Sequence, residues 1–94
     1  MIVFDPYWIT HLNPRESETV RAWLIDHKVD PQYCMHVEWD GIDTFNAVMY
    51  ILDANGSPMI NRDTQEPVTR DHVFVTHVIP DVMKETASAQ VRSP

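Results

Sequence analysis

The fold is decided by residues 33–52, which read YCMHVEWDGIDTFNAVMYIL. Apolar and polar residues alternate on both sides of Asp40-Gly41, a dipeptide that is typical of hairpin turns. Alternation with a period of two indicates a strand that buries one of its faces. We therefore predict a hairpin made of two strands, Tyr33–Trp39 and Thr44–Leu52.

The length of the hairpin loop determines which residues face each other. A three-residue loop at 40–42 sets Val37 opposite Phe45 and Met35 opposite Ala47, so that one face is apolar throughout. A two-residue loop would pair apolar with polar side chains, because a slip of one residue turns every side chain to the other face. The three-residue loop is therefore our prediction.

A second turn signal, Asn55-Gly56, follows the hairpin. A two-residue turn at this point sets Leu52 opposite Met59 and starts a third strand at 58–61. We expect that strand at an edge of the sheet, because Pro58 has no N–H to donate to a neighbour.

The next two segments differ sharply in polarity. Residues 62–71 are polar and are predicted to form a loop, whereas residues 72–79 are apolar on both sides and rich in Val. This pattern favours a fourth strand, ended by Pro80. We expect it in a central position beside the first strand of the hairpin.

A helix precedes the hairpin. Asn13, Pro14 and Glu16 have the spacing of an N-cap, a first helical residue and the third position of a capping box. The helix is predicted at about 14–28, before Asp30-Pro31, and its buried stripe consists of Val20, Trp23, Leu24 and His27.

The two ends of the chain receive separate predictions. In residues 1–12 we expect a short strand at Ile2–Phe4 and an aromatic arm that packs on the domain. Residues 84–94 are small and polar and are predicted to be a disordered tail. The expected fold is a single α+β domain at 1–83, with one N-terminal helix on a small, mostly antiparallel sheet of three to four strands.

Composition narrows the classes of function. The chain has 94 residues, with 14 acidic and 7 basic side chains and a net charge of −7. This balance argues against binding to nucleic acid or to an anionic membrane surface. A single Cys excludes an internal disulfide. Because no apolar run reaches the length of a membrane span and no signal peptide is present, we expect a cytoplasmic protein.

Three stretches carry a resemblance to other proteins. They are Val-Arg-Ala-Trp-Leu at 20–24 with His27, Val-Asp-Pro at 29–31, and Val-Ile-Pro at 78–80. Over residues 19–80 the chain resembles small uncharacterised proteins of actinobacteria and their phages and prophages. That pattern favours Gly where this chain has Lys28, so either a non-Gly residue adopts the left-handed helix cap or the helix ends in another way. The resemblance implies a phage or prophage origin and an accessory role, without a catalytic motif.

Cys34 and His36 are the residues most open to a chemical interpretation. Alternate residues of a strand share one face, so the two side chains are able to converge on a metal ion or to act as nucleophile and base. A zinc site needs three or four ligands, and Glu38 nearby raises rather than lowers a thiol pKa. We expect no catalytic residue, no metal and no cofactor, and keep an enzyme using Cys34 and His36 as an alternative.

Binding to another protein is the function that we favour. One helix covers one face of the sheet, and an uncovered apolar face usually marks a protein contact. We predict a homodimer, a complex with a bacterial host protein, or both, and name a virion or assembly component as the alternative. The candidate contact residues on the strands and in the N-terminal arm are Val48, Tyr50, Leu52, Met59, Phe74, Val78, Phe4, Tyr7 and Trp8.

Overall fold

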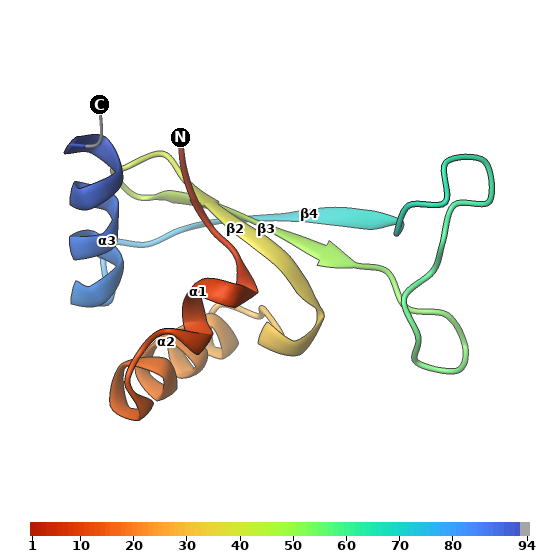
Figure 1. Ribbon diagram of the computed structural model, residues 1–94, viewed down its shortest axis with the longest axis horizontal. Coiled ribbons are helices and arrows are strands. Elements are labelled where there is room, and N and C mark those ends of the chain that lie inside the picture. The colour runs from red at the N-terminus through yellow and green to blue at the C-terminus, as the bar shows by residue number, and fades with distance from the viewer. Residues whose placement is uncertain (93–94) are drawn as a thin grey trace.

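The computed structural model describes the backbone of residues 1–92 and the side chains of residues 1–89 (Figure 1). It has an α+β fold, which confirms the predicted class, although the helices differ in number from the prediction. Four antiparallel strands lie in the order β1-β2-β3-β4, namely β1 (Ile2–Phe4), β2 (Cys34–Trp39), β3 (Thr44–Tyr50) and β4 (Thr69–Val75). The helices are α1 (Pro6–Thr10), α2 (Pro14–Asp26), the 3-10 turn η1 (Pro31–Tyr33) and α3 (Asp81–Arg92).

The helices cover one face of the sheet. Figure 1 shows α1 and α2 below the strands and α3 at the end where β2 turns into β3. The buried side chains come from the covered face of the sheet and from these helices. They are Phe4, Val20, Trp23, Leu24, Val29, Cys34, Val37, Trp39, Phe45, Ala47, Met49, Met83 and Ala87.

A row of aromatic rings crosses the covered face. Trp39 pairs with Phe45, and Phe45 pairs with Phe74, so the three side chains share one register line. Their rings stack in parallel, with centroids 5.4 Å and 5.2 Å apart. Trp23 of α2 meets the row edge-on, 5.0 Å from Phe45, and donates its indole N–H to the carbonyl of Val78 at 2.6 Å. The predicted burial of Trp23 is confirmed, since only 7% of it is exposed.

Both ends of α2 follow from the sequence. Asn13 accepts the N–H of Glu16, and Glu16 accepts the N–H of Asn13, which is the predicted capping box. At the other end, the N–H of Val29 reaches the carbonyl of Leu24, and the N–H of Lys28 reaches that of Ile25. This is the Schellman arrangement, and Lys28 occupies its left-handed position with φ of 66°.

From His36 to Tyr50 the hairpin faces are as predicted, but a bulge moves Cys34 to the covered face, and the pairing differs by two residues. Val37 lies opposite Ala47, not Phe45, because the three-residue loop is 41–43. Asp40 fixes this loop by accepting the N–H groups of Ile42, Asp43 and Thr44 at 2.8–3.2 Å. These amides, that of Ile42 first, hold the pKa of Asp40 below its ordinary value.

The segment after β3 differs more from the prediction. No strand forms at 58–61, where only two isolated bridges occur, Leu52 with Pro58 and Ile60 with Pro67. Asp53 accepts the N–H groups of Asn55 and Ser57, so the turn has three residues and Met59 does not lie opposite Leu52. The side-chain oxygen of Asp53 therefore stabilises a three-residue turn in place of the two-residue turn that Asn55-Gly56 suggests.

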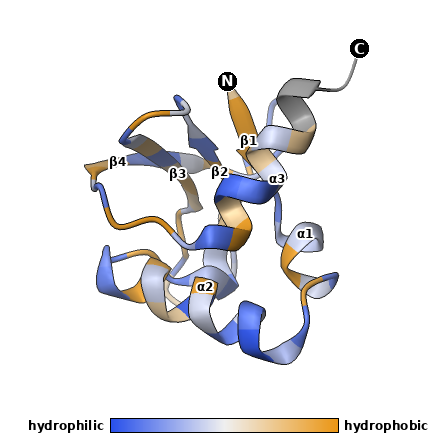
Figure 2. Ribbon diagram, turned by 90° about the vertical axis from the view of Figure 1, so that its left-hand side faces the viewer, coloured by the Kyte–Doolittle hydropathy of each residue, from blue (hydrophilic) through white to orange (hydrophobic). Residues whose placement is uncertain are grey.

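The fourth strand was expected in the centre of the sheet, and that prediction is wrong. β4 spans Thr69–Val75, pairs only with β3, and lies at the edge (Figure 2). Val73 and Val75 are 62% and 63% exposed, so the run of apolar residues does not reflect burial on both faces.

The prediction of a disordered tail at 84–94 is also wrong for the residues that the structure describes. Residues 81–92 form α3, and the side chains of Met83 and Ala87 are in the core. Their spacing of four residues is one turn of a helix, which a stretch of small polar residues conceals. Residues 93 and 94 lie outside the described part.

The N-terminal arm is structured as well: β1 forms as predicted, and the rest of the arm forms helix α1.

Candidate functional site

The face of the sheet opposite the helices is uncovered among the described residues. Along β3, Thr44, Asn46, Val48 and Tyr50 point to this open face, and all four are half-buried. Their partners on β4 are Val75, Val73, Asp71 and Thr69. No side chain of these two sets is buried, in contrast to Phe45, Ala47 and Met49 on the covered face.

The open face is less apolar than the sequence suggested, because a polar group occupies its middle. Asn46 donates from its side-chain nitrogen to Asp71 Oδ1 at 3.2 Å and to Glu38 Oε2 at 3.5 Å. Glu38 also contacts the ring of His36 at 3.1 Å. The apolar side chains of the face therefore form two groups, Val48 with Tyr50 on β3 and the two valines of β4.

The structure separates the nine candidate contact residues. Val48 and Tyr50 lie on the open face as predicted. Phe74 does not, because it belongs to the aromatic row of the covered face. Phe4 is buried in the core, and Trp8 packs on Phe4 with ring centroids 4.8 Å apart. The N-terminal arm therefore joins the helix side of the sheet and does not cover the open face.

The remaining candidates lie outside the sheet. Leu52 and Met59 belong to a two-turn lobe, residues 51–68, which projects from the end of the sheet opposite α3 (Figure 1). Tyr7 on α1 is 69% exposed, and Val78, between β4 and α3, is 75% exposed.

The two-turn lobe is held by backbone hydrogen bonds and by two Asx side chains. Ile51, Met59 and Val68 connect its three segments through N–H···O bonds of 2.8–3.0 Å. Asn61 accepts the N–H groups of Asp63 and Thr64, as Asp53 does in the other turn. Every side chain at 53–66 is exposed, Met59 and Ile60 included, so the lobe has no core of its own.

The outer edge of β4 is a third feature of this region. Thr76 donates to Asp43, and Ile51 donates to Val68, so residues 68, 70, 72, 74 and 76 direct their backbone groups toward β3. The alternate residues Thr69, Asp71, Val73 and Val75 direct theirs outward. Within the described chain, no strand pairs with this side of β4 (Figure 2).

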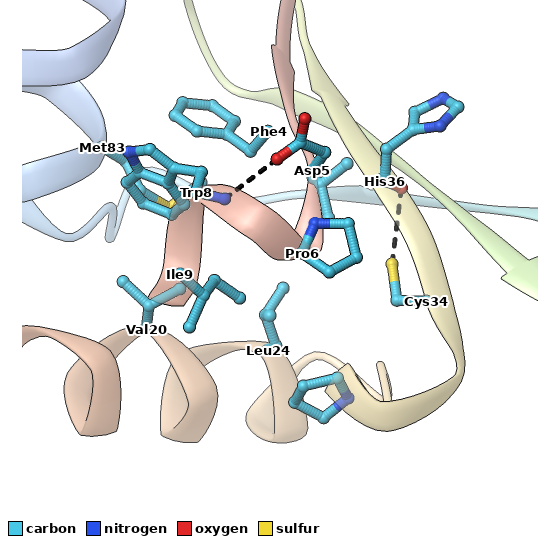
Figure 3. A pocket seen from close by; sticks show the side chains of 12 residues that line it. Phe4, Asp5, Pro6, Trp8, Ile9, Val20, Leu24, Cys34, His36 and Met83 are labelled. Atoms are coloured by element: carbon cyan, nitrogen blue, oxygen red, sulfur yellow. Dashed lines mark hydrogen bonds between the residues drawn. The ribbon is translucent and has the colours of Figure 1, made fainter. Parts of the chain in front are cut away.

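Cys34 and His36 do not form the pair that their spacing suggests. A β-bulge between them places Cys34 on the covered face and the His36 ring on the open face. Cys34 donates its S–H to the backbone carbonyl of His36 at 3.4 Å, and Figure 3 shows the ring of His36 turned away from the sulfur. Burial raises the pKa of the Cys34 thiol to about 11. The arrangement therefore lacks the thiolate and the adjacent base of a nucleophilic site.

The sulfur borders a small, partly open apolar pocket lined by the N-terminal arm, α2, β2 and α3 (Figure 3). Its volume is about 20 Å³, the size of a single water, and its walls include Phe4, Trp8, Leu24 and Met83. A cavity of this size and polarity is a packing defect rather than a ligand site.

The histidines have local structural partners. His27 Nδ1 donates to the carbonyl of Trp23, and His72 Nε2 donates to the carbonyl of His27, both at 2.8 Å. Across residues 1–92, no three His, Cys, Asp or Glu side chains lie close enough together to hold a metal ion.

Sequence reasoning missed two parts of this region, the β4 edge and the two-turn lobe. The spacing of Asp53 and Asn61 ahead of their turns was a usable signal for the lobe, since both side chains accept backbone amides two residues later. The edge position of β4 had no comparable signal, because strand order depends on contacts between distant residues.

Comparison of the chain with models of protein families, with curated proteins and with solved structures finds no match. None of the helices in the described part of the chain combines the length and apolarity that crossing a membrane requires.

Proposed function

We propose that this chain is a small, non-enzymatic accessory protein of phage or prophage origin that acts by binding other proteins in the cytoplasm. The observation that carries this proposal is the open face of the sheet. It holds Val48 and Tyr50 side by side with no helix above them among residues 1–92. Antiparallel sheets commonly leave one face to solvent, and apolar side chains grouped on such a face mark a protein contact.

The charge of the chain and the resemblance over residues 19–80 support the rest of the proposal. Between Val29 and Asn61 the sequence has no Lys or Arg, and the net charge is −7, which suits a partner with a basic surface. A bacterial host protein fits this description. The proposal also includes a homodimer of the chain. The setting implied by the resemblance favours a host-directed role over a part of the virion.

A paired substitution tests the open face. Val48→Lys with Tyr50→Lys places charge on the apolar pair that β3 contributes to the face, and Asp71, opposite Val48, gives the ammonium group introduced there a counter-charge that keeps the fold intact. Ile25→Lys is the matched control, since Ile25 is exposed on α2, away from the open face. The wild type and the control should slow growth of an actinobacterial host and retain the same captured host protein, and the double variant should lose both.

The alternative, a virion or assembly component, has its own readout. Detection of the chain in purified particles, with no effect on host growth when it is expressed alone, would replace the host-directed proposal. The third candidate, an enzyme using Cys34 and His36, has little support because the two side chains lie on opposite faces of β2. An unchanged growth effect in Cys34→Ala would remove it.

A further inference from the structure

The outer edge of β4 lacks most of the devices that keep a sheet edge from pairing. The strand runs for seven residues, Thr69–Val75, without a Pro, a Gly or a Lys, and its register with β3 is continuous, without a bulge. Natural proteins protect exposed edges with such features or cover them. An edge of this length without them is therefore a site where another strand adds to the sheet.

Charge limits the identity of that strand. The whole chain carries a net charge of −7, but β4 contains one Arg and one Asp, Arg70 and Asp71, and is neutral apart from His72. Two copies of this strand meet without the repulsion that most of the acidic surface would cause. A basic partner segment would gain little here, whereas a second β4 is matched in charge, length and polarity.

We propose that β4 pairs antiparallel with β4 of a second copy, with the two-fold axis at Val73. This inference rests on the proposed function, in which the chain forms a homodimer, and it names the surface through which the two copies bind. The outward backbone groups of Val73 would bond to those of the second Val73, and Asp71 would bond to Val75 on either side. About six new backbone hydrogen bonds would result.

The side chains favour this register over the registers with the axis at Asp71 or at His72. An axis at Asp71 would set the two Asp71 carboxylates directly opposite each other, which is unfavourable for like charges. An axis at His72 would set Val73 against Asp71 and Val75 against Thr69, so that no exposed valine would face a valine of the other copy. The axis at Val73 places one β-branched side chain against its copy, and each Val75 lies diagonally beside it.

The assembly would also join the two open faces. Two four-stranded sheets become one continuous sheet, so that Val48 and Tyr50 of each copy lie on a shared surface.

Cysteine cross-linking tests the axis directly. In Val73→Cys the two new thiols would lie on α-carbons about 5.5 Å apart, within the range that a disulfide spans. In the matched variant Asp71→Cys, the copies would be offset by four residues, about 13 Å along the strand. We expect most of Val73→Cys to form a linked dimer under mild oxidation and Asp71→Cys to form at least about five times less. The wild type is the background control, because Cys34 is buried.

Equal cross-linking of the two variants, or faster cross-linking of Asp71→Cys, would overturn the register. So would a wild-type mass of 10.9 kDa in light scattering at all concentrations up to about 100 µM.

A backbone substitution tests the edge without a disulfide. Val73→Pro removes an outward N–H that β3 does not use, so the sheet itself keeps its hydrogen bonds. Val73→Thr keeps the N–H and the β-branched shape. The Pro variant should be a folded monomer by circular dichroism and light scattering, and the Thr variant should remain a dimer. A dimeric, folded Val73→Pro would refute the edge pairing.

The two proposals fail in different ways. If the wild type is monomeric but the Lys pair at 48 and 50 abolishes the growth effect, the edge dimer is wrong and the open-face proposal stands. If Val73→Cys cross-links but the Lys pair changes neither growth nor capture, the edge dimer stands and the open-face proposal is wrong. If Val73→Pro loses a host protein that a monomeric wild type retains, the occupant of the edge is that protein and not a second copy.

Discussion

The two ends of this molecule are built on different principles. At the α3 end, three helices and the aromatic row of Trp39, Phe45 and Phe74 enclose a core. At the other end, the two-turn lobe extends the molecule to 39 Å along its longest axis without burying any side chain from 53 to 66. Side-chain burial holds the first region together, and backbone hydrogen bonds with Asx oxygens hold the second.

This difference indicates where stability and contact are to be sought. Burial of apolar surface supplies most of the free energy of folding, so substitutions at the core end change the stability of the whole domain. The lobe, the open face and the β4 edge contribute little burial and leave side chains and backbone groups accessible. Regions that bind partners are commonly drawn from this less stable part of a fold.

The largest expected effect is at Trp23. Trp23→Ala removes a buried ring that meets Phe45 and Phe74 and a hydrogen bond to the carbonyl of Val78. We expect the free energy of unfolding to fall by about 3–5 kcal/mol, measured by urea denaturation. Ile60→Ala in the lobe is the contrast and should change it by no more than about 0.5 kcal/mol. Similar losses in the two variants would show that the lobe is part of the same cooperative core.

The next effect concerns α3, which the sequence did not predict. Met83→Ala removes a side chain that is 1% exposed, between the N-terminal arm and α2, and enlarges a cavity that already exists. The expected loss of stability is about 2–4 kcal/mol. Its neighbour Lys84 is exposed, so Lys84→Ala should lie within about 0.5 kcal/mol of the wild type. A Met83→Ala curve that overlays the wild type would show that α3 does not dock.

The sequence predicted best where the signal is local. The capping box of Asn13 and Glu16, the burial of Val20, Trp23 and Leu24 on α2 and the alternation from His36 to Tyr50 depend on neighbouring residues, and the structure confirms them. The left-handed Lys28 is one of the two outcomes that the local pattern left open. For the same reason, the faces of the hairpin strands were right beyond the bulge at 34–36, even though their pairing differed by two residues.

The errors arose where contacts between residues far apart in the sequence determine the structure. The edge position of β4 depends on which strands meet, and the burial of Met83 depends on a cavity formed by the arm and α2. Cys34 and His36 were assigned to one face because a bulge leaves no mark in the alternation. The candidate contact residues show the same contrast. The positions of Val48 and Tyr50 on the open face follow from the alternation along β3, whereas those of Phe4, Trp8 and Phe74 depend on how the N-terminal arm and β4 pack in the fold.

A smaller effect, dependent on pH, is expected at Cys34. Burial raises the pKa of its thiol to about 11, above its ordinary value near 9, so the folded state holds this proton more tightly than the unfolded state. The contribution is fully present below pH 9 and is lost as pH rises from about 9 toward 11. Stability measured at steps across this range should fall more steeply in the wild type than in Cys34→Ala. Parallel curves would mean that the thiol is accessible to solvent.

The smallest effect compares the same change of backbone freedom at the two ends. Lys28 and Gln65 have φ of 66° and 63°, in the left-handed region that disfavours side chains, one at the end of α2 and the other in the lobe. Lys28→Gly should raise the free energy of unfolding by up to about 1 kcal/mol, because Val29 and Leu24 of the same cap are in the core. Gln65→Gly relieves the same strain where nothing is buried, so it should slow hydrogen exchange of the lobe amides and leave the global transition unchanged. Equal gains in global stability would show that lobe and core unfold as one unit, and the contrast between the two ends would then be one of shape alone.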